Sequence, residues 1–217
     1  MKTQLLIACD FDGTVTRQDT LVEILDLYGS ARWREIQNEV VSGKLSIREG
    51  LQAEMGAVRA NLEQIKDLLA NRVELEPSFQ PFLRKMRGLG IPLILLSGGF
   101  DLCVEAVLTN AGLWPLPFLA NRLRRHNGCW AVEFPYPSPN CSACGHCKGD
   151  PIRGWNQQGF TTIFVGNGVT DHCAAQQAKL TFAKEELLSW CQTQAIPAVS
   201  FRTFDDVDGE LIQRGWL

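Results

Sequence analysis

Two aspartates, Asp10 and Asp12, lie directly after a short apolar run, in the segment Asp-Phe-Asp-Gly-Thr-Val-Thr. Carboxylates at the end of a buried strand are costly to remove from water unless a cation or a reaction requires them. If the chain turns at Gly13, one carboxylate can face a substrate while the other stands close to it. Because this arrangement suits a nucleophile paired with an acid/base group, we interpret Asp10 and Asp12 as a candidate catalytic centre.

Three later segments carry polar groups of complementary kinds. Ser97-Gly-Gly99 offers a hydroxyl and closely spaced amides to an anionic oxygen, and Lys148 would supply a point charge. Residues 166–171, Gly-Asn-Gly-Val-Thr-Asp, carry polar groups that could hold a divalent ion. We predict a site for phosphoryl transfer, because a carboxylate, a hydroxyl, an ammonium and a metal-binding loop would meet where the strands end.

The elements that must position these groups alternate along the chain. Continuous apolar runs, each typical of a strand buried on both faces, occur at 4–9, 91–96, 161–165 and 180–183. Helical patterns separate or follow them, at 81–89, 102–108, 171–177 and 185–193. This alternation predicts an α/β fold, a doubly wound parallel sheet that binds ligands at the carboxyl ends of its strands.

Two insertions interrupt the alternation. Residues 17–75 have the pattern of consecutive amphipathic helices, one of them started by a capping box of Ser46 and Glu49, which predicts a helical cap. Residues from about 114 to 150 predict a hairpin around Asn127-Gly128, followed by a proline-rich and cysteine-rich segment. The α/β core is then expected to comprise residues 1–16 and 76–217, with the second insertion inside it.

Cysteines recur at two-residue intervals directly before Lys148, at Cys141, Cys144 and Cys147. With Cys129 or His126 of the hairpin as a fourth ligand, they could hold a structural Zn²⁺, and reduced thiols that pack a turn are an equal alternative. A disulfide ranks last in a reducing compartment. In each case the expected role of this segment is to aim Lys148, not to carry the reaction.

Composition favours a small-molecule partner. The 217 residues are 45% hydrophobic, enough for one substantial core, and the net charge of −3 provides no basic surface for nucleic acid. No apolar run reaches the roughly 18 to 20 residues that cross a membrane. We therefore expect a cytoplasmic protein that binds neither nucleic acid nor membrane, with the oligomeric state open and a homodimer among the options.

The order DFDGTVT, LLSGG, CKGD and VGNGVTD resembles the haloacid dehalogenase superfamily of phosphatases, and its spacing is similar to the phosphoserine phosphatase-like branch with a helical cap. The resemblance covers nearly the whole chain. It implies Mg²⁺-dependent hydrolysis of a small phosphomonoester through an aspartyl-phosphate. Asp10 would be the nucleophile, and Asp12 would be the general acid and then the base that activates water.

The resemblance also implies roles for the later motifs. Ser97, Gly98 and Lys148 would hold the phosphoryl oxygens. The Mg²⁺ ligands would be Asp10, the carbonyl of Asp12, Asn167 and Asp171. The family usually has aspartate where this chain has Asn167, and an amide oxygen can still bind Mg²⁺ but removes one negative charge, so cation affinity should fall.

Within this branch, the segments SGKLSIREG, LANRL and LTFAKEELLSWC and the cysteine-rich approach to the lysine are most similar to phosphatases of methionine salvage. Phosphoserine, phosphoethanolamine and phosphocholine stay open as substrates. Phosphoserine phosphatases hold the substrate ammonium with an acidic residue at the position of Asp19, and they carry a cap arginine where this chain has Glu54. Candidate selectors of the leaving group are Asp19, Trp33, Arg48 and Glu54.

Two hypotheses from other classes stay open. A catalytically weak member of the family would bind phosphate esters with little turnover, and Asn167→Asp should then raise its activity. A zinc-stabilised interaction module would bind its partner without Asp10, and it would lose that partner when a thiolate-bound metal is chelated.

Overall fold

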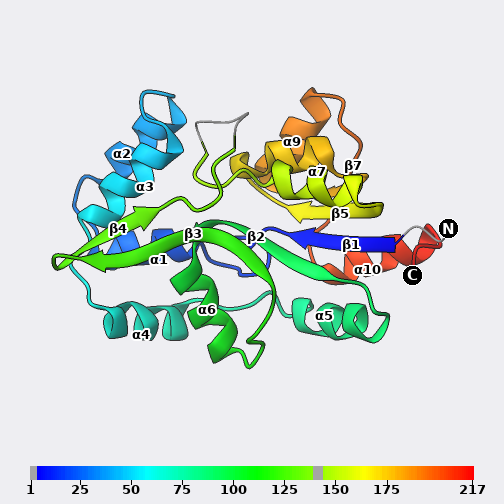
Figure 1. The fold of residues 1–217 in the computed structure, drawn as a ribbon, viewed down its shortest axis with the longest axis horizontal. Helices are drawn as coiled ribbons and strands as arrows, with labels where there is room; N and C mark the ends of the chain where they lie inside the picture. The colour runs from blue at the N-terminus through cyan, green and yellow to red at the C-terminus, as the bar shows by residue number, and fades with distance from the viewer. Residues whose placement is uncertain (1–3, 139–143) are drawn as a thin grey trace. The chain divides into compact units, whose positions relative to one another are not determined.

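The computed structural model describes residues 4–138 and 144–217 and has an α/β fold (Figure 1). Its strands are hydrogen-bonded in the order β4-β3-β2-β1-β5-β6-β7. They are β1 (Gln4–Cys9), β2 (Leu93–Phe100), β3 (Phe118–His126), β4 (Cys129–Glu133), β5 (Phe160–Gly166), β6 (Leu180–Ala183) and β7 (Ala198–Ser200). The pairs from β2 to β7 are parallel, and β3 and β4 are antiparallel. The predicted fold class is confirmed.

The chain forms two compact units. The first comprises residues up to 17, 74–96 and 148–217, and the second comprises 18–73 and 97–147. The division falls inside β2, between Leu96 and Ser97. The boundaries expected for a cap at 17–75 stay a prediction.

The first unit is built on parallel strands with helices on both sides. Its helices are α5 (Phe79–Gly88), α7 (Gly149–Gln157), the short 3-10 helix η1 (Val169–Asp171), α8 (His172–Gln177), α9 (Glu185–Thr193) and α10 (Phe204–Gln213). Figure 1 shows α7 and α9 on one side of the strands and α5 and α10 on the other. Residues 6–9 of β1 are buried because strands flank them on both edges and helices cover both faces. The continuous apolar run at 4–9 reflects this burial.

The second unit consists of helices and a hairpin. Its helices are α1 (Thr20–Tyr28), α2 (Trp33–Val41), α3 (Ile47–Gly56), α4 (Leu62–Arg72) and α6 (Asp101–Asn110). The predicted capping box of Ser46 and Glu49 starts α3. The predicted hairpin joins β3 to β4 through Asn127 and Gly128, whose φ angles of 49° and 82° are those of a tight turn that matches the strand twist. Within residues 4–138 and 144–217, no helix is long and apolar enough to cross a membrane.

Candidate active site

Lys148 joins two buried carboxylates of the first unit. Its ammonium donates a hydrogen bond to Asp10 Oδ1 and another to Asp171 Oδ1, the latter 2.6 Å long. The exposed fractions are 1% for Lys148, 5% for Asp10 and 0% for Asp171. Because an isolated buried charge is costly, each of the three depends on the others for compensation.

The parallel strands bring these residues together. Cys9 of β1 lies opposite Val165 of β5, and the Asp10 amide donates to the Val165 carbonyl at 2.9 Å. Asp171 ends η1 just after β5, and Lys148 directly precedes α7, which packs on β5. Residues far apart in the sequence therefore meet where two neighbouring strands end, as the strand-end argument predicts.

A tight turn follows Asp10. The carbonyl of Phe11 accepts from the amides of Thr14, Val15 and Thr16 at 3.2, 2.9 and 3.0 Å. Gly13 has a φ of 74°, and a Cβ there would stand 2.6 Å from Asn167 Nδ2, so glycine fits this position on both counts. Asp12 is half-buried in the turn.

Asp171 also fixes the loop after β5. Its Oδ2 accepts from the amides of Asn167 and Gly168 at 2.9 and 3.1 Å, while its Oδ1 accepts from Lys148. Both carboxylate oxygens are therefore engaged by protein donors. These hydrogen bonds connect the lysine to the loop after β5.

The side chain of Asn167 is held at both ends. Thr14 Oγ1 donates to Asn167 Oδ1 at 3.2 Å, and Asn167 Nδ2 donates to Glu185 Oε2 at 3.0 Å. Sequence reasoning did not single out Thr14 or Glu185. The position of Glu185, two residues after β6, is the signal that could have found it, because polar groups after parallel strands meet at one edge of the sheet.

Burial and charge shift the pKa values of the central pair. Burial, and then the charge of Asp171, raises the pKa of Asp10 to about 7 even though Lys148 lowers it. Burial alone would lower the pKa of Lys148, but the charges of Asp10 and Asp171 raise it above its usual value. The lysine therefore stays charged between the carboxyl groups of Asp10 and Asp171.

Ser97 and Gly98 belong to the second unit. The buried Ser97 Oγ accepts from the Gly99 amide at 3.0 Å, and the Gly98 carbonyl accepts from Asn121 Nδ2 at 2.8 Å. Both residues lie inside β2, which continues to Phe100, and not after its end as the apolar run at 91–96 predicted. Binding of a phosphoryl oxygen by Ser97 and Gly98 stays a prediction.

Three candidate selectors have local roles in the second unit. Asp19 caps α1, with Oδ1 accepting from the Leu21 and Val22 amides at 2.9 and 3.0 Å. Trp33 is buried with the Arg34 guanidinium over its ring. The Arg48 guanidinium has two contacts, one over the Phe134 ring and one in which Nε donates to the Cys144 carbonyl at 3.1 Å. Arg48 thus ties α3 to the segment that leads to the lysine.

Glu54, the fourth candidate selector, is a buried carboxyl. It is 1% exposed, and its Oε1 lacks a hydrogen-bond partner among the described residues. Burial, together with the charge of Asp19, raises its pKa to about 7, although a hydrogen bond with Gln37 lowers it. Glu54 is therefore close to half protonated at neutral pH.

Glu54 is expected to make stability depend on pH. Its pKa is about 7 in the folded chain and near the ordinary 4.5 when unfolded, so the folded state binds the proton more tightly between these values. The free energy of unfolding should therefore fall as pH rises through this window. Glu54→Gln should remove the part of the fall that Glu54 contributes and be about 1 to 2 kcal/mol more stable than wild type at about pH 8.

Urea unfolding at about pH 4.5 and about pH 8 measures this difference. Glu105→Gln, which alters an exposed glutamate of α6, is the matched control and should leave the pH profile unchanged. Parallel pH profiles for wild type and Glu54→Gln would contradict the assignment.

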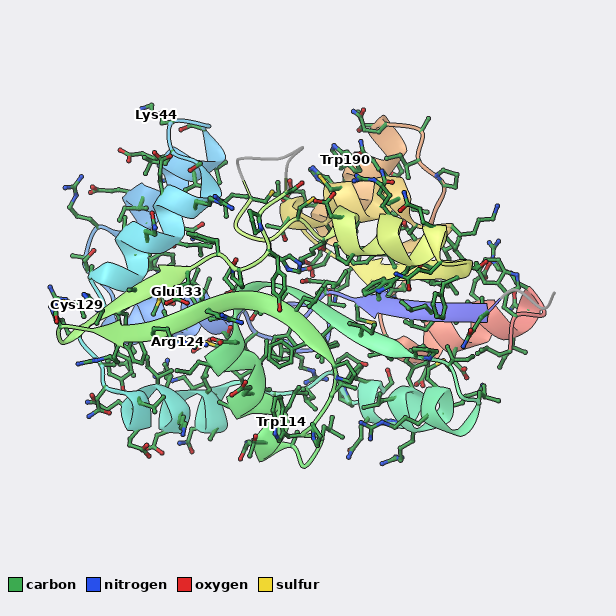
Figure 2. The ribbon with its side chains drawn as sticks, in the orientation of Figure 1. Lys44, Trp114, Arg124, Cys129, Glu133 and Trp190 are labelled. Atoms are coloured by element: carbon green, nitrogen blue, oxygen red, sulfur yellow. The ribbon has the colours of Figure 1, made fainter. Side chains whose placement is uncertain are left out.

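The cysteine segment does not form a metal centre among the described residues. Cys141 lies outside residues 4–138 and 144–217, Cys144 and Cys147 are free thiols, and Cys129 is exposed at the hairpin end (Figure 2). Within those residues no three histidine, cysteine, aspartate or glutamate side chains converge to hold a metal ion. The structure gives no support to the structural zinc or to the interaction module built on it.

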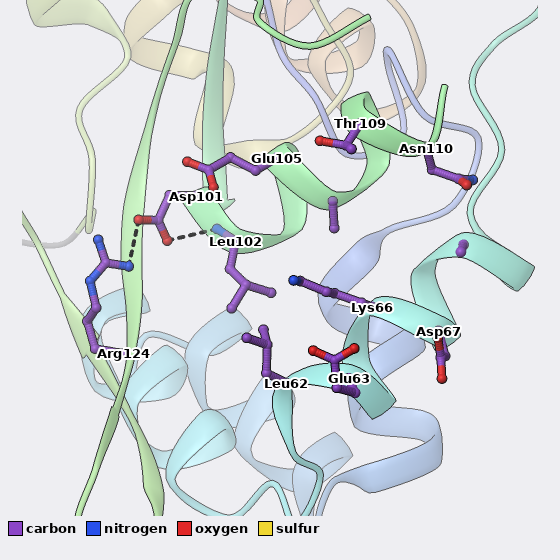
Figure 3. Close-up of a pocket in the computed structure, with 12 residues that line it drawn as sticks. Leu62, Glu63, Lys66, Asp67, Asp101, Leu102, Glu105, Thr109, Asn110 and Arg124 are labelled. Atoms are coloured by element: carbon purple, nitrogen blue, oxygen red, sulfur yellow. Dashed lines mark hydrogen bonds and ion pairs between the residues drawn. The ribbon is translucent and has the colours of Figure 1, made fainter. Parts of the chain in front are cut away.

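A surface cavity of about 580 Å³ lies in the second unit between α4 and α6 (Figure 3). Arg124 pairs with Asp101 at its edge at 2.8 Å, and Asp101 Oδ1 also accepts from the amides of Leu102 and Leu123. These contacts connect α6 to β3. Because the lining includes none of the predicted catalytic side chains, we regard this cavity as a packing feature of the helices.

The fold and the strand-end cluster define the class of protein. A family model of haloacid dehalogenase-like hydrolases matches residues 7–176, and the chain belongs to this family. A Bacillus cereus relative named 2-hydroxy-3-keto-5-methylthiopentenyl-1-phosphate phosphatase is 32% identical over 209 residues, 94% of each chain. A Bacillus thuringiensis relative of the same name is 31% identical over the same length.

Solved structures share the fold. A phospho-aspartyl intermediate analogue of phosphoserine phosphatase matches with a TM-score of 0.72 and 21% identity, covering 96% of this chain and 99% of that one. The expected family and the expected phosphatase class are confirmed.

Proposed function

We propose that this chain hydrolyses a small phosphomonoester with Mg²⁺ through an aspartyl-phosphate on Asp10. The observation that carries the proposal is the buried Lys148, which bridges Asp10 and Asp171 where β1 and β5 end. A buried ammonium beside a carboxylate is suited to an incoming phosphoryl group, since it offers a fixed positive charge in a low-dielectric site.

The residues of the cluster support an in-line displacement. An Asp10 oxygen would attack phosphorus while the bond to the leaving oxygen breaks, and the carboxyl of Asp12 would give that oxygen its proton. Asp12 would then take a proton from water, which attacks the aspartyl-phosphate and releases phosphate. Lys148 would stay charged throughout, because its raised pKa keeps the proton on the ammonium.

The donor set fits a hard divalent cation. The carboxylate of Asp10, the main-chain carbonyl of Asp12 and the amide oxygen of Asn167 would be its ligands, since Mg²⁺ prefers oxygen. The hydrogen bond from Thr14, in the turn after Asp10, to Asn167 Oδ1 supports this assignment, because it brings the two segments together. Asp171 is already engaged by Lys148 and two amides, which favours a supporting role for it. When bound, the cation would neutralise charge on the phosphoryl group.

The proposed substrate is 2-hydroxy-3-keto-5-methylthiopentenyl-1-phosphate, the ester in the names of the Bacillus relatives, which implies a place in methionine salvage. The side chain of Glu54 favours this ester over phosphoserine as the substrate. Glu54 is a buried carboxyl where the phosphoserine enzymes would need an arginine for the substrate carboxylate, and a carboxyl repels that group when ionised.

Phosphate release with and without Mg²⁺ tests the proposal. We expect the methylthiopentenyl ester to have a kcat/KM at least about tenfold above phosphoserine, phosphocholine, phosphoethanolamine and an aryl phosphate. EDTA should abolish turnover and added Mg²⁺ should restore it. A preference for phosphoserine would overturn the substrate assignment, and no turnover of any ester by folded protein would favour a catalytically weak scaffold.

A further inference from the structure

Glu185 fixes the direction of the Asn167 amide. An amide group has a donor end and an acceptor end, whereas an ionised carboxylate only accepts. Because Glu185 Oε2 accepts from Asn167 Nδ2 at 3.0 Å, the amide oxygen must point the opposite way, where Thr14 Oγ1 donates to it at 3.2 Å. A flipped amide would present its hydrogens to a cation and repel it.

The backbone places Glu185 at this point. The Lys184 amide donates to the Gly166 carbonyl at 3.2 Å, and the Leu187 amide donates to the Asn167 carbonyl at 2.9 Å. The start of α9 is thus fastened to the loop that carries Asn167. Glu185 itself has a φ of 50°, a left-handed conformation that a residue with a side chain adopts only at a cost. The flanking hydrogen bonds hold the carboxylate in place despite this cost.

Glu185 also supplies a charge that the Asn167 amide lacks. Among residues 4–138 and 144–217, Glu185 forms no ion pair, so its carboxylate has no cationic side chain in direct contact. Asp171, the other acidic group near the loop, is already bound to Lys148. The carboxylate of Glu185 therefore contributes negative potential on the side of Asn167 away from Thr14.

We propose that Glu185 is a positioning residue of the cation site: it holds the Asn167 amide so that the oxygen would be the end available to a cation, and its charge would replace the missing one through space. The inference rests on the proposed function, since it concerns the same cation site. It explains how a loop with asparagine in place of a carboxylate can still bind Mg²⁺. Removing a residue that orients a metal ligand by a hydrogen bond typically lowers metal affinity by about 10-fold to 100-fold.

The test is the affinity of the substrate-free protein for Mg²⁺, measured by calorimetry. Glu185→Gln keeps the size of the side chain but removes its charge and lets the amide turn, so we expect affinity to fall about 10-fold. Glu186→Gln removes the same charge from the next residue, which is also exposed, and should leave affinity unchanged. At saturating Mg²⁺ the kcat of Glu185→Gln should match wild type, because Glu185 does not touch the reacting atoms.

A second pair of variants separates positioning from general charge. Asn167→Asp has no amide to orient, so adding Glu185→Gln to it should remove only the through-space charge and lower affinity by less than about threefold, a smaller fall than in wild type. An equal fall in Mg²⁺ affinity in both backgrounds would overturn the positioning role, and so would wild-type affinity in Glu185→Gln. In either case Mg²⁺ binding by the wild type would still agree with the proposed function. Failure of wild type to bind Mg²⁺ would overturn both.

Discussion

Asp10→Asn is expected to lower phosphate release by at least about 10³-fold, because an amide cannot form the acyl phosphate on which turnover depends. The substitution should not cost stability. It removes a carboxyl group whose pKa burial, and then the charge of Asp171, raise to about 7, and Lys148 keeps Asp171 as a partner. The free energy of unfolding should therefore stay close to wild type, which makes the lost activity a chemical effect.

Two measurements check this outcome. Mass spectrometry of acid-quenched protein should detect a covalent phosphoryl group on wild type during turnover and none on Asp10→Asn. Asp67→Asn, which alters an exposed aspartate of α4, should keep wild-type turnover. Turnover of Asp10→Asn within tenfold of wild type would exclude Asp10 as the nucleophile.

Lys148→Met is expected to lower both activity and stability. Methionine has a similar length but no charge, so Asp10 and Asp171 would be left buried without their common partner. Removing one member of a buried ion pair typically costs about 3 to 5 kcal/mol. Loss of the fixed positive charge should lower kcat by about 10² to 10³-fold. Urea unfolding and Mg²⁺-dependent phosphate release measure the two effects, and Lys179→Met is the exposed control.

Adding Asp171→Asn separates the two roles of Lys148. The double variant Lys148→Met with Asp171→Asn no longer buries an uncompensated carboxylate at position 171, so a large part of the lost stability should return. Activity should stay low, because no ammonium would face the phosphoryl group. Recovery of activity together with stability would mean that Lys148 acts only through folding.

Most elements of the first unit follow from local pattern. The apolar runs at 4–9, 161–165 and 180–183 correspond to β1, β5 and β6, because a strand covered on both faces must be apolar throughout. Sequence reasoning did not predict β7 or α10. β7 has three residues, none of them buried, so its sequence has no apolar run that would predict a strand. In α10, by contrast, the buried Phe204, Val207 and Leu211 recur at helical spacing, and this pattern was available.

The sequence by itself determined which segments could carry the chemistry. Polar groups follow buried strands at Asp10 and at 166–171, and charged groups are tolerated there only when they are paired or used. That signal does not depend on the fold in detail.

Only the tertiary structure decided which groups meet. The order of parallel strands makes β5 the common neighbour of β1 and β6, so Lys148 can bridge Asp10 and Asp171, and Glu185 can reach Asn167. The hydrogen bonds and the raised pKa of Asp10 depend on burial among these non-sequential partners. Contacts between residues distant in the chain are set by packing, which local pattern does not specify.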